Sequence, residues 1–146
     1  MRCEHRVEVG CSPEKAFALL DDLPQTPKWL APCTAIEKVV PGPNRVGDQL
    51  KYSYLQGGRA GTMQGEILAR NPTSKLTCRY FDKMFEIVVD FNVAKSPGGA
   101  SLTHVITITP KTWISRLMSP LVAMALPKQT REAMASLKTI LDSQIT

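Results

Sequence analysis

The last thirty or so residues carry the longest apolar periodicity in the chain. Within residues 113–145, apolar side chains recur at steps of three and four, the spacing of one face of an α-helix. They are Ile114, Leu117, Met118, Leu121, Val122 and Ala125, then Thr130, Ala133, Met134, Leu137, Ile140 and Leu141. The opposite face carries charged residues such as Lys128 and Asp142. Because almost everything before this stretch alternates like short strands, we expect a sheet that wraps around this helix.

Two prolines interrupt the stretch. A proline inside a helix removes one hydrogen bond and clashes with the preceding turn, at a cost of about 3 kcal/mol. Pro120 and Pro127 therefore either kink the helix or break it. In the second case Ser119-Pro120 begins a new helix, and residues 113–118 form a separate short one. Residues 128–143 are the part predicted as continuous helix.

Length and composition indicate a single globular domain, residues 1–146. The hydrophobic fraction is 43% and the charged fraction 21%, both ordinary for a soluble protein. The longest apolar-rich run, residues 113–126, contains Arg116 and Pro120 and is shorter than the ~20 residues of a membrane span. The first residues alternate polar and apolar, unlike a secretory signal. We therefore expect a cytoplasmic protein, and the sequence does not indicate its oligomeric state.

The cysteines and charges argue against several kinds of site. The four cysteines, Cys3, Cys11, Cys33 and Cys78, form no C-x-x-C pair and show no zinc-like spacing, so we interpret them as reduced thiols. The net charge of +5 suits an acidic ligand, RNA or a membrane surface, but no aromatic–basic motif of nucleic-acid binding occurs. The glycine-rich residues 57–61 lack the phosphate-loop pattern and are predicted to be a flexible hairpin tip. We expect no metal, no cofactor and no nucleic acid.

The rest of the chain is predicted to form strands and turns. Residues 2–9 alternate strictly and make a first strand with a charged outer face. Two short helices follow, one beginning at Ser12-Pro13-Glu14 and one at Thr26-Pro27. Six further strands are predicted at residues 35–40, 48–56, 63–70, 76–81, 84–94 and 101–109. Hairpin-length links indicate an α+β fold, with seven antiparallel strands curled around a long C-terminal helix.

Several local strings, in this order, resemble the START-related (SRPBCC) superfamily, which includes the polyketide cyclase/dehydrase-like proteins. The strings are residues 12–22, residues 28–33, the strand at 36–39, Val46-Gly47-Asp48 and Leu137-Lys138. Each is degenerate, so the specificity lies in their order. The resemblance implies a helix-grip fold whose internal cavity, between sheet and helix, holds an apolar small molecule. It does not fix the activity, because carriers and cyclases share the fold.

Strand alternation predicts which side chains line this cavity. In residues 84–94 the odd positions are wholly apolar, whereas the even ones include Glu86 and Asp90, which are costly to bury unpaired. The candidates for ligand contact are Trp29, Tyr52, Tyr54, Cys78, Tyr80, Phe85, Ile87, Val89, Phe91, His104, Ile106, Leu121 and Met124. A buried phenol seeks a partner that a ligand carbonyl or hydroxyl can supply. Simple wall packing is the alternative, and Trp29 is placed at the cavity mouth as a plug or a stacking contact.

Both histidines are predicted to face this interior. The resemblance places the first and last strands side by side, which makes His5 and His104 neighbours. Imidazole titrates near neutral pH, so the pair is the candidate for proton transfer or for orienting a ligand. Alternatively, both are partly buried histidines that bond to tyrosine hydroxyls or to the backbone.

Three functions are compatible with these patterns. The first, which we expect, is a non-catalytic binder or carrier of a hydrophobic or amphipathic small molecule. The second is a cyclase- or dehydratase-like enzyme that uses the histidines and tyrosines, since such chemistry needs a shaped pocket and one or two proton-transfer groups. The third is an interaction module whose residues 113–126 contact a membrane or a partner protein. The sequence does not name the ligand.

Overall fold

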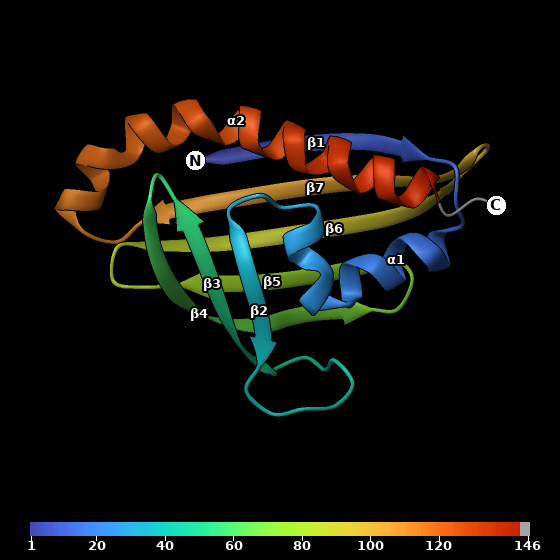
Figure 1. The fold of residues 1–146 in the computed structure, drawn as a ribbon, viewed down its shortest axis with the longest axis horizontal. Coiled ribbons are helices and arrows are strands. Elements are labelled where there is room, and N and C mark those ends of the chain that lie inside the picture. Colours follow the sequence, from blue (N-terminus) through green and yellow to red (C-terminus); the bar gives the residue numbers. More distant parts are fainter. Residues whose placement is uncertain (144–146) are drawn as a thin grey trace.

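One antiparallel sheet curves around one long helix in the computed structural model, which describes residues 1–143 (Figure 1). The predicted end of the helix at residues 144–145 lies outside the described residues. The strands are β1 (Arg2–Val9), β2 (Cys33–Lys38), β3 (Gln49–Gln56), β4 (Arg59–Asn71), β5 (Lys75–Phe81), β6 (Phe85–Ser96) and β7 (Gly99–Pro110). The helices are α1 (Pro13–Asp21), the 3-10 helix η1 (Leu23–Lys28) and α2 (Trp113–Asp142). The predicted α+β helix-grip fold is confirmed.

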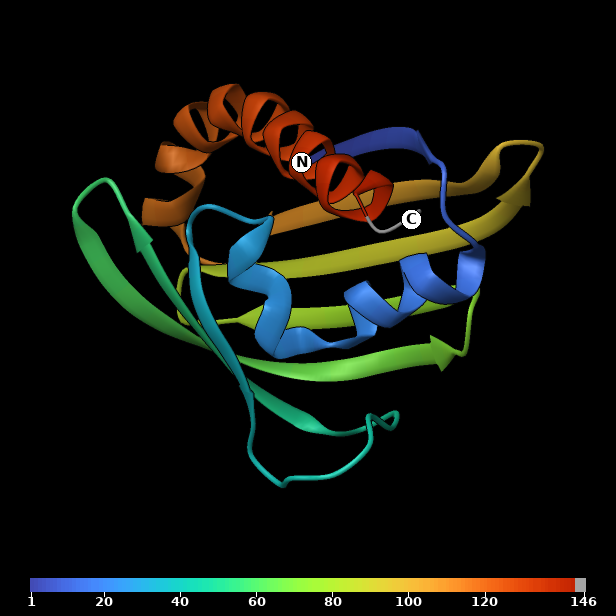
Figure 2. The same ribbon diagram turned by 45° about the vertical axis from the view of Figure 1, so that its right-hand side comes forward.

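The sheet has the strand order β1-β7-β6-β5-β4-β3-β2, and every neighbouring pair is antiparallel. β1 and β2 are therefore opposite edges, and the link between them carries α1 and η1 across the concave side (Figure 2). The Ser12 hydroxyl accepts a hydrogen bond from the backbone N–H of Lys15 and caps α1 as predicted. The interior of the protein thus lies between the sheet, the two short helices and α2.

α2 is one curved helix of 30 residues (Figure 2). It begins with a capping box in which Thr112 and Ser115 satisfy each other's backbone N–H groups. Pro120 and Pro127 both lie inside it, so the helix bends and does not break. The Ser119 hydroxyl donates to the Ser115 carbonyl, a bond that also favours bending. In residues 1–143, no helix is long and apolar enough to cross a membrane.

The second half of α2 provides the helical part of the core. Its buried side chains are Thr130, Ala133, Met134, Leu137 and Leu141. The inward direction predicted for the first half is wrong, because Leu117 and Leu121 are exposed whereas Ser115 is buried. At about 100° per residue, the predicted stripes of the two halves are centred about 130° apart around the axis. A single helix cannot turn both toward the sheet, and the core packing of the second half decides its orientation.

The predicted bounds of the second short helix and of β2 are wrong. η1 begins at Leu23 and not at Thr26-Pro27, because α1 ends at Asp21 and Pro24 fits the first turn of the next helix. β2 covers Cys33–Lys38 in place of residues 35–40. Its last two predicted residues are exposed and precede a proline-rich turn.

The β3–β4 hairpin is tighter than predicted. Gly57 and Gly58 have φ values of 59° and 79°, both positive, as in the two-residue turns that match strand twist. β4 begins immediately afterwards at Arg59, so residues 59–61 pair with β3. The expected flexible loop over residues 57–61 is therefore a two-residue turn.

We expect Gly99→Ala to destabilise the protein by about 2 kcal/mol. Gly99 has a φ of +147°, and a Cβ there would meet the Val9 carbonyl oxygen and lie 2.7 Å from the carbonyl oxygen of Cys11. Both are backbone atoms, one at the end of β1 and one in the link to α1, and they cannot swing away as a side chain can. Urea unfolding measures the loss, and Gly98→Ala is the matched control because its Cβ would meet nothing within 4 Å. Equal midpoints for the two variants would contradict the prediction.

Candidate functional site

The concave face of the sheet carries a cluster of tyrosine rings. Tyr52 and Tyr54 share a face of β3, as alternation predicts, and their ring centroids are 6.2 Å apart. The ring of Tyr80 on β5 lies 5.0 Å from that of Tyr52, although β4 runs between their strands. Gly65 of β4 makes this possible, since a Cβ there would lie 2.6 Å from Cδ1 of Tyr80. The fold thus places three phenols in one patch of the interior.

A second aromatic cluster joins η1 to the middle of the sheet. Trp29, the residue after η1, packs edge-on against Phe91 of β6 at 5.6 Å. Phe91 in turn stacks on the His104 ring of β7 at 4.6 Å. Trp29 and His104 are each only 6% exposed. The structure therefore brings together three of the predicted site residues and buries Trp29 against the sheet.

Two polar atoms in this second cluster have no partner. Within residues 1–143, Nε1 of Trp29 and Nδ1 of His104 are the buried side-chain nitrogen or oxygen atoms that make no hydrogen bond. Both rings pack against the same phenyl ring, that of Phe91. Burying such a group unpaired costs about 1–3 kcal/mol. A polar group that bonded to either atom would remove this cost.

The predicted histidine pair is present. His5 of β1 lies directly opposite His104 of β7 in the antiparallel register. Burial, and to a lesser extent the neighbouring His5, lowers the pKa of His104 from 6.5 to about 4. His104 is therefore neutral at neutral pH, and its ring can both donate and accept a hydrogen bond.

The thiols and phenols of the interior are also neutral. Burial raises the pKa of the Cys33 thiol to about 11 and that of Cys78 to about 12. It raises the pKa of the Tyr52 and Tyr80 hydroxyls above their ordinary value as well. All four cysteines are free, as predicted. A thiol that burial keeps neutral is a poor nucleophile.

The remaining predicted contacts divide into two groups. Ile87, Val89, Phe85 and Ile106 lie on the inward phase of β6 and β7, and the first two pack against the core. Leu121 and Met124 do not reach the interior, because both are largely exposed on the first half of α2. Sequence periodicity alone predicted the wrong face of this half of the helix to point inward. In residues 1–143, no cluster of three or more His, Cys, Asp or Glu side chains could hold a metal ion.

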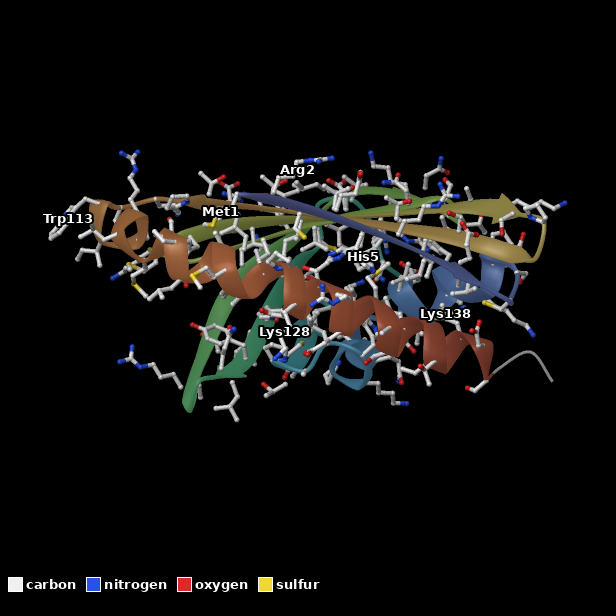
Figure 3. All side chains as sticks on the ribbon, turned by 90° about the horizontal axis from the view of Figure 1, so that it is seen from above. Met1, Arg2, His5, Trp113, Lys128 and Lys138 are labelled. Atoms are coloured by element: carbon white, nitrogen blue, oxygen red, sulfur yellow. The ribbon has the colours of Figure 1, made fainter. Side chains whose placement is uncertain are left out.

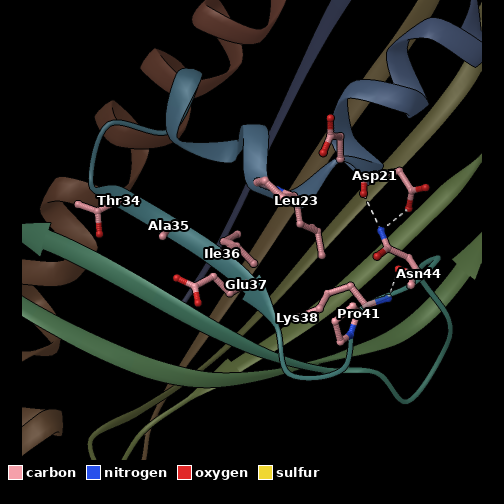
Figure 4. Close-up of a pocket in the computed structure, with 12 residues that line it drawn as sticks. Asp21, Leu23, Thr34, Ala35, Ile36, Glu37, Lys38, Pro41 and Asn44 are labelled. Carbon is pink, nitrogen blue, oxygen red and sulfur yellow. Dashed lines mark hydrogen bonds between the residues drawn. The ribbon is translucent and has the colours of Figure 1, made fainter.

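We describe two of the hollows in the surface of residues 1–143, and neither is the cavity predicted between sheet and helix. One, of about 560 Å³, is lined by η1, β2 and the turn after it (Figure 4). The other, of about 860 Å³, runs along β3 and β4 to Lys111. Neither is lined by α2 or by any ring of the two aromatic clusters.

The polar groups beside the first hollow bind one another. Arg70 donates to the two carboxylate oxygens of Asp21 at 2.9 and 2.8 Å, and Nδ2 of Asn44 donates to the same carboxylate at 3.0 Å. Although burial opposes it, these bonds lower the pKa of Asp21. Sequence patterns could not reveal this cluster, because its members are 23 and 49 positions apart. We interpret it as a structural tie between α1 and β4.

The whole chain has the sequence pattern of one described family. Residues 1–142 match the family described as polyketide cyclase / dehydrase and lipid transport. The chain belongs to this family. The resemblance seen in the sequence is thereby confirmed. No curated protein matches the sequence significantly.

Several solved structures share the fold of this chain. TTHA0849 from Thermus thermophilus superposes with a TM-score of 0.77 and 13% identity over 100% of this chain and 99% of that one. MLL2253 from Mesorhizobium loti superposes with a TM-score of 0.75 and 17% identity over 100% of both chains. The di-domain ARO/CYC BexL from the BE-7585A biosynthetic pathway superposes with a TM-score of 0.76 and 12% identity over 97% of this chain and 50% of that one. At these identities the likeness shows the shared fold.

Proposed function

We propose that this family member binds an amphipathic small molecule, with an apolar body and one polar end, inside the fold. The observation that carries the proposal is the pair of unpartnered buried nitrogens on Trp29 and His104. A ligand carbonyl or hydroxyl oxygen placed between them accepts from the indole N–H and bonds to the neutral imidazole. The bond would remove the cost of two unsatisfied groups at once.

The apolar part of the ligand is matched by the rest of the interior. Phe91, Ile87 and Val89 supply apolar surface on β6, and Tyr52 and Tyr80 add rings with polar ends. Sites for small molecules are typically built in this way, from an apolar lining and a few fixed polar groups. The neighbour BexL is described as a di-domain ARO/CYC from the BE-7585A biosynthetic pathway, so this fold occurs in a protein of small-molecule biosynthesis.

A cyclase- or dehydratase-like reaction is the second candidate, and the same residues support it less well. General acid–base catalysis is most efficient when the pKa of the group lies near the working pH. The pKa of His104 is about 4, and the pKa of Tyr80 is raised above its ordinary value. His104 is thus a weak base and Tyr80 a weak acid near pH 7. Binding without chemistry is favoured.

The chain offers a built-in reporter for this binding, because it contains only two tryptophans. In Trp113→Phe the remaining Trp29 lies in the proposed site, whereas Trp113 is 72% exposed and lies outside that site. We expect 2-nonanone or 2-acetylnaphthalene to change Trp29 emission in this variant, and native mass spectrometry of wild type to detect a co-purified small molecule. His104→Phe in the same background should weaken binding about tenfold, because a hydrogen bond is lost from a buried polar group.

Two outcomes would overturn the proposal. One is the absence of both a co-purified molecule and any response of Trp29 to either ketone. The other is an unchanged affinity in the His104→Phe variant. Wild type and Trp113→Phe should bind with the same affinity by calorimetry, which controls for the reporter substitution itself.

A further inference from the structure

The first half of α2 exposes an apolar ridge to solvent. We define this ridge as Trp113, Leu117, Leu121 and Met124, whose exposed fractions are 72%, 71%, 70% and 79%. Ile114 and Met118, at 47% and 43%, flank it. Single exposed apolar residues are ordinary, but six along one half of a helix form a continuous patch that marks an interaction surface.

The ridge points away from the interior. At about 100° per residue, Leu117 lies nearly opposite Ser115 around the helix axis. Ser115 and Leu126 are the buried residues of this half, so they define the side that faces the sheet. Figure 3 shows Trp113 projecting outward at the end of the molecule where α2 begins. The ridge is therefore not a wall of the proposed ligand site, and its apolar surface needs a different partner.

The stretch of sequence that contains the ridge carries basic residues and no acidic ones, and Asp82 is an acidic neighbour in space, beside Lys111. Residues 91–131 contain no Asp or Glu. They contain five basic residues, of which Lys111, Arg116, Lys128 and Arg131 lie just before or within α2, whereas Lys95 pairs with Ala100 at the far end of the β6–β7 hairpin. Arg116 lies within the ridge segment and is exposed. Nζ of Lys128 is 4.0 Å from Oε1 of Glu132, the first acidic residue after residues 91–131. An apolar helix face with basic residues on its flanks matches the surface of an anionic bilayer, where apolar groups enter and cations meet lipid phosphates.

We propose that the ridge docks this protein onto an anionic phospholipid membrane, with α2 lying in the plane of the interface. Trp113 at the N-terminal end of α2 suits this position, because indole prefers the boundary between lipid headgroups and acyl chains. The helix lies on the membrane and does not cross it, in keeping with the lack of a spanning helix in residues 1–143. A second copy of the chain fits less well, since pairing two ridges also brings their basic residues together.

Vesicle flotation tests the proposal directly. Wild type should bind anionic vesicles, made of phosphatidylcholine mixed with phosphatidylglycerol, and salt should release it from them. Its binding to vesicles of phosphatidylcholine alone should be at least about fivefold weaker. Leu117→Ser/Leu121→Ser should lower the partition coefficient at least about tenfold, and Arg116→Gln about fivefold. In Trp29→Phe, whose only tryptophan is Trp113, the emission should shift to shorter wavelength on the anionic vesicles.

Matched substitutions elsewhere control for general loss of apolar surface or charge. Val40→Ser removes a side chain of the same exposure, 70%, from the β2–β3 link, and Lys75→Gln removes an exposed cation from β5. Both should float like wild type. All substituted side chains on the ridge are exposed, so the variants should unfold at the wild-type midpoint.

Three results would overturn the proposal. Wild type that floats with neither kind of vesicle has no such docking surface. Equal flotation of wild type and Leu117→Ser/Leu121→Ser places any binding elsewhere. A dimer in light scattering that the double variant dissolves would show that a second copy covers the ridge. None of these results bears on ligand binding, which Trp29 emission reports separately.

Discussion

Leu137→Ala is expected to lower the free energy of unfolding by about 3–4 kcal/mol, the largest effect of any substitution considered for this chain. Leu137 has no exposed surface and lies among Met134, Leu141 and the sheet side of the core. Removing three carbons there costs the lost transfer free energy and leaves a cavity that the surrounding strands cannot fill. Chemical denaturation at 25 °C measures the change from the shift in midpoint.

Leu117→Ala on the same helix is the matched control. The substitution is chemically identical, but Leu117 is 71% exposed, so we expect a change within about 0.5 kcal/mol. The difference between the two losses of stability measures how far the second half of α2 is packed in the core while the first half is exposed. Comparable losses for the two variants would mean that the first half of the helix packs on the protein in solution.

His104 is expected to make stability fall as the pH is lowered from about 6.5 to about 4. Its pKa is about 4 in the folded protein and 6.5 at its ordinary value, so between these pH values the unfolded chain binds a proton that the folded protein does not. Stability from this group is therefore complete above pH 6.5 and is lost as the pH falls toward 4. The difference of about 2.5 in pKa corresponds to a loss of about 3 kcal/mol.

Unfolding free energies measured between pH 7 and pH 4 in wild type and His104→Phe test this prediction. The variant should show a much flatter dependence over this range. Carboxyls whose pKa is lowered in the fold, such as Asp21 and Asp142, lose their contribution at lower pH and should do so in both proteins. Parallel curves for wild type and variant would exclude His104 as the source.

Short-range patterns account for what could be predicted correctly. The inward phase of β6, with Phe91 and Val93 buried, follows from a period of two along a single strand. The cap of α1 at Ser12 is likewise local. The pairing of His5 with His104 needed the strand order that the family resemblance supplied. Contacts between residues far apart in the sequence, such as Asp21 and Arg70, could not be predicted from local patterns.

The C-terminal helix shows where the two kinds of information divide. The sequence by itself predicted an amphipathic helix over residues 128–143 with Leu137 and Leu141 inward, and α2 ends at Asp142, because the spacing and the hydrophobic effect are enough. Only the tertiary structure decided that the prolines bend α2 without breaking it, and that Leu117 and Leu121 face solvent. The physical reason is that a helix has one orientation against its sheet. The half with the larger apolar contact fixes that orientation, and the other half must present whatever face remains.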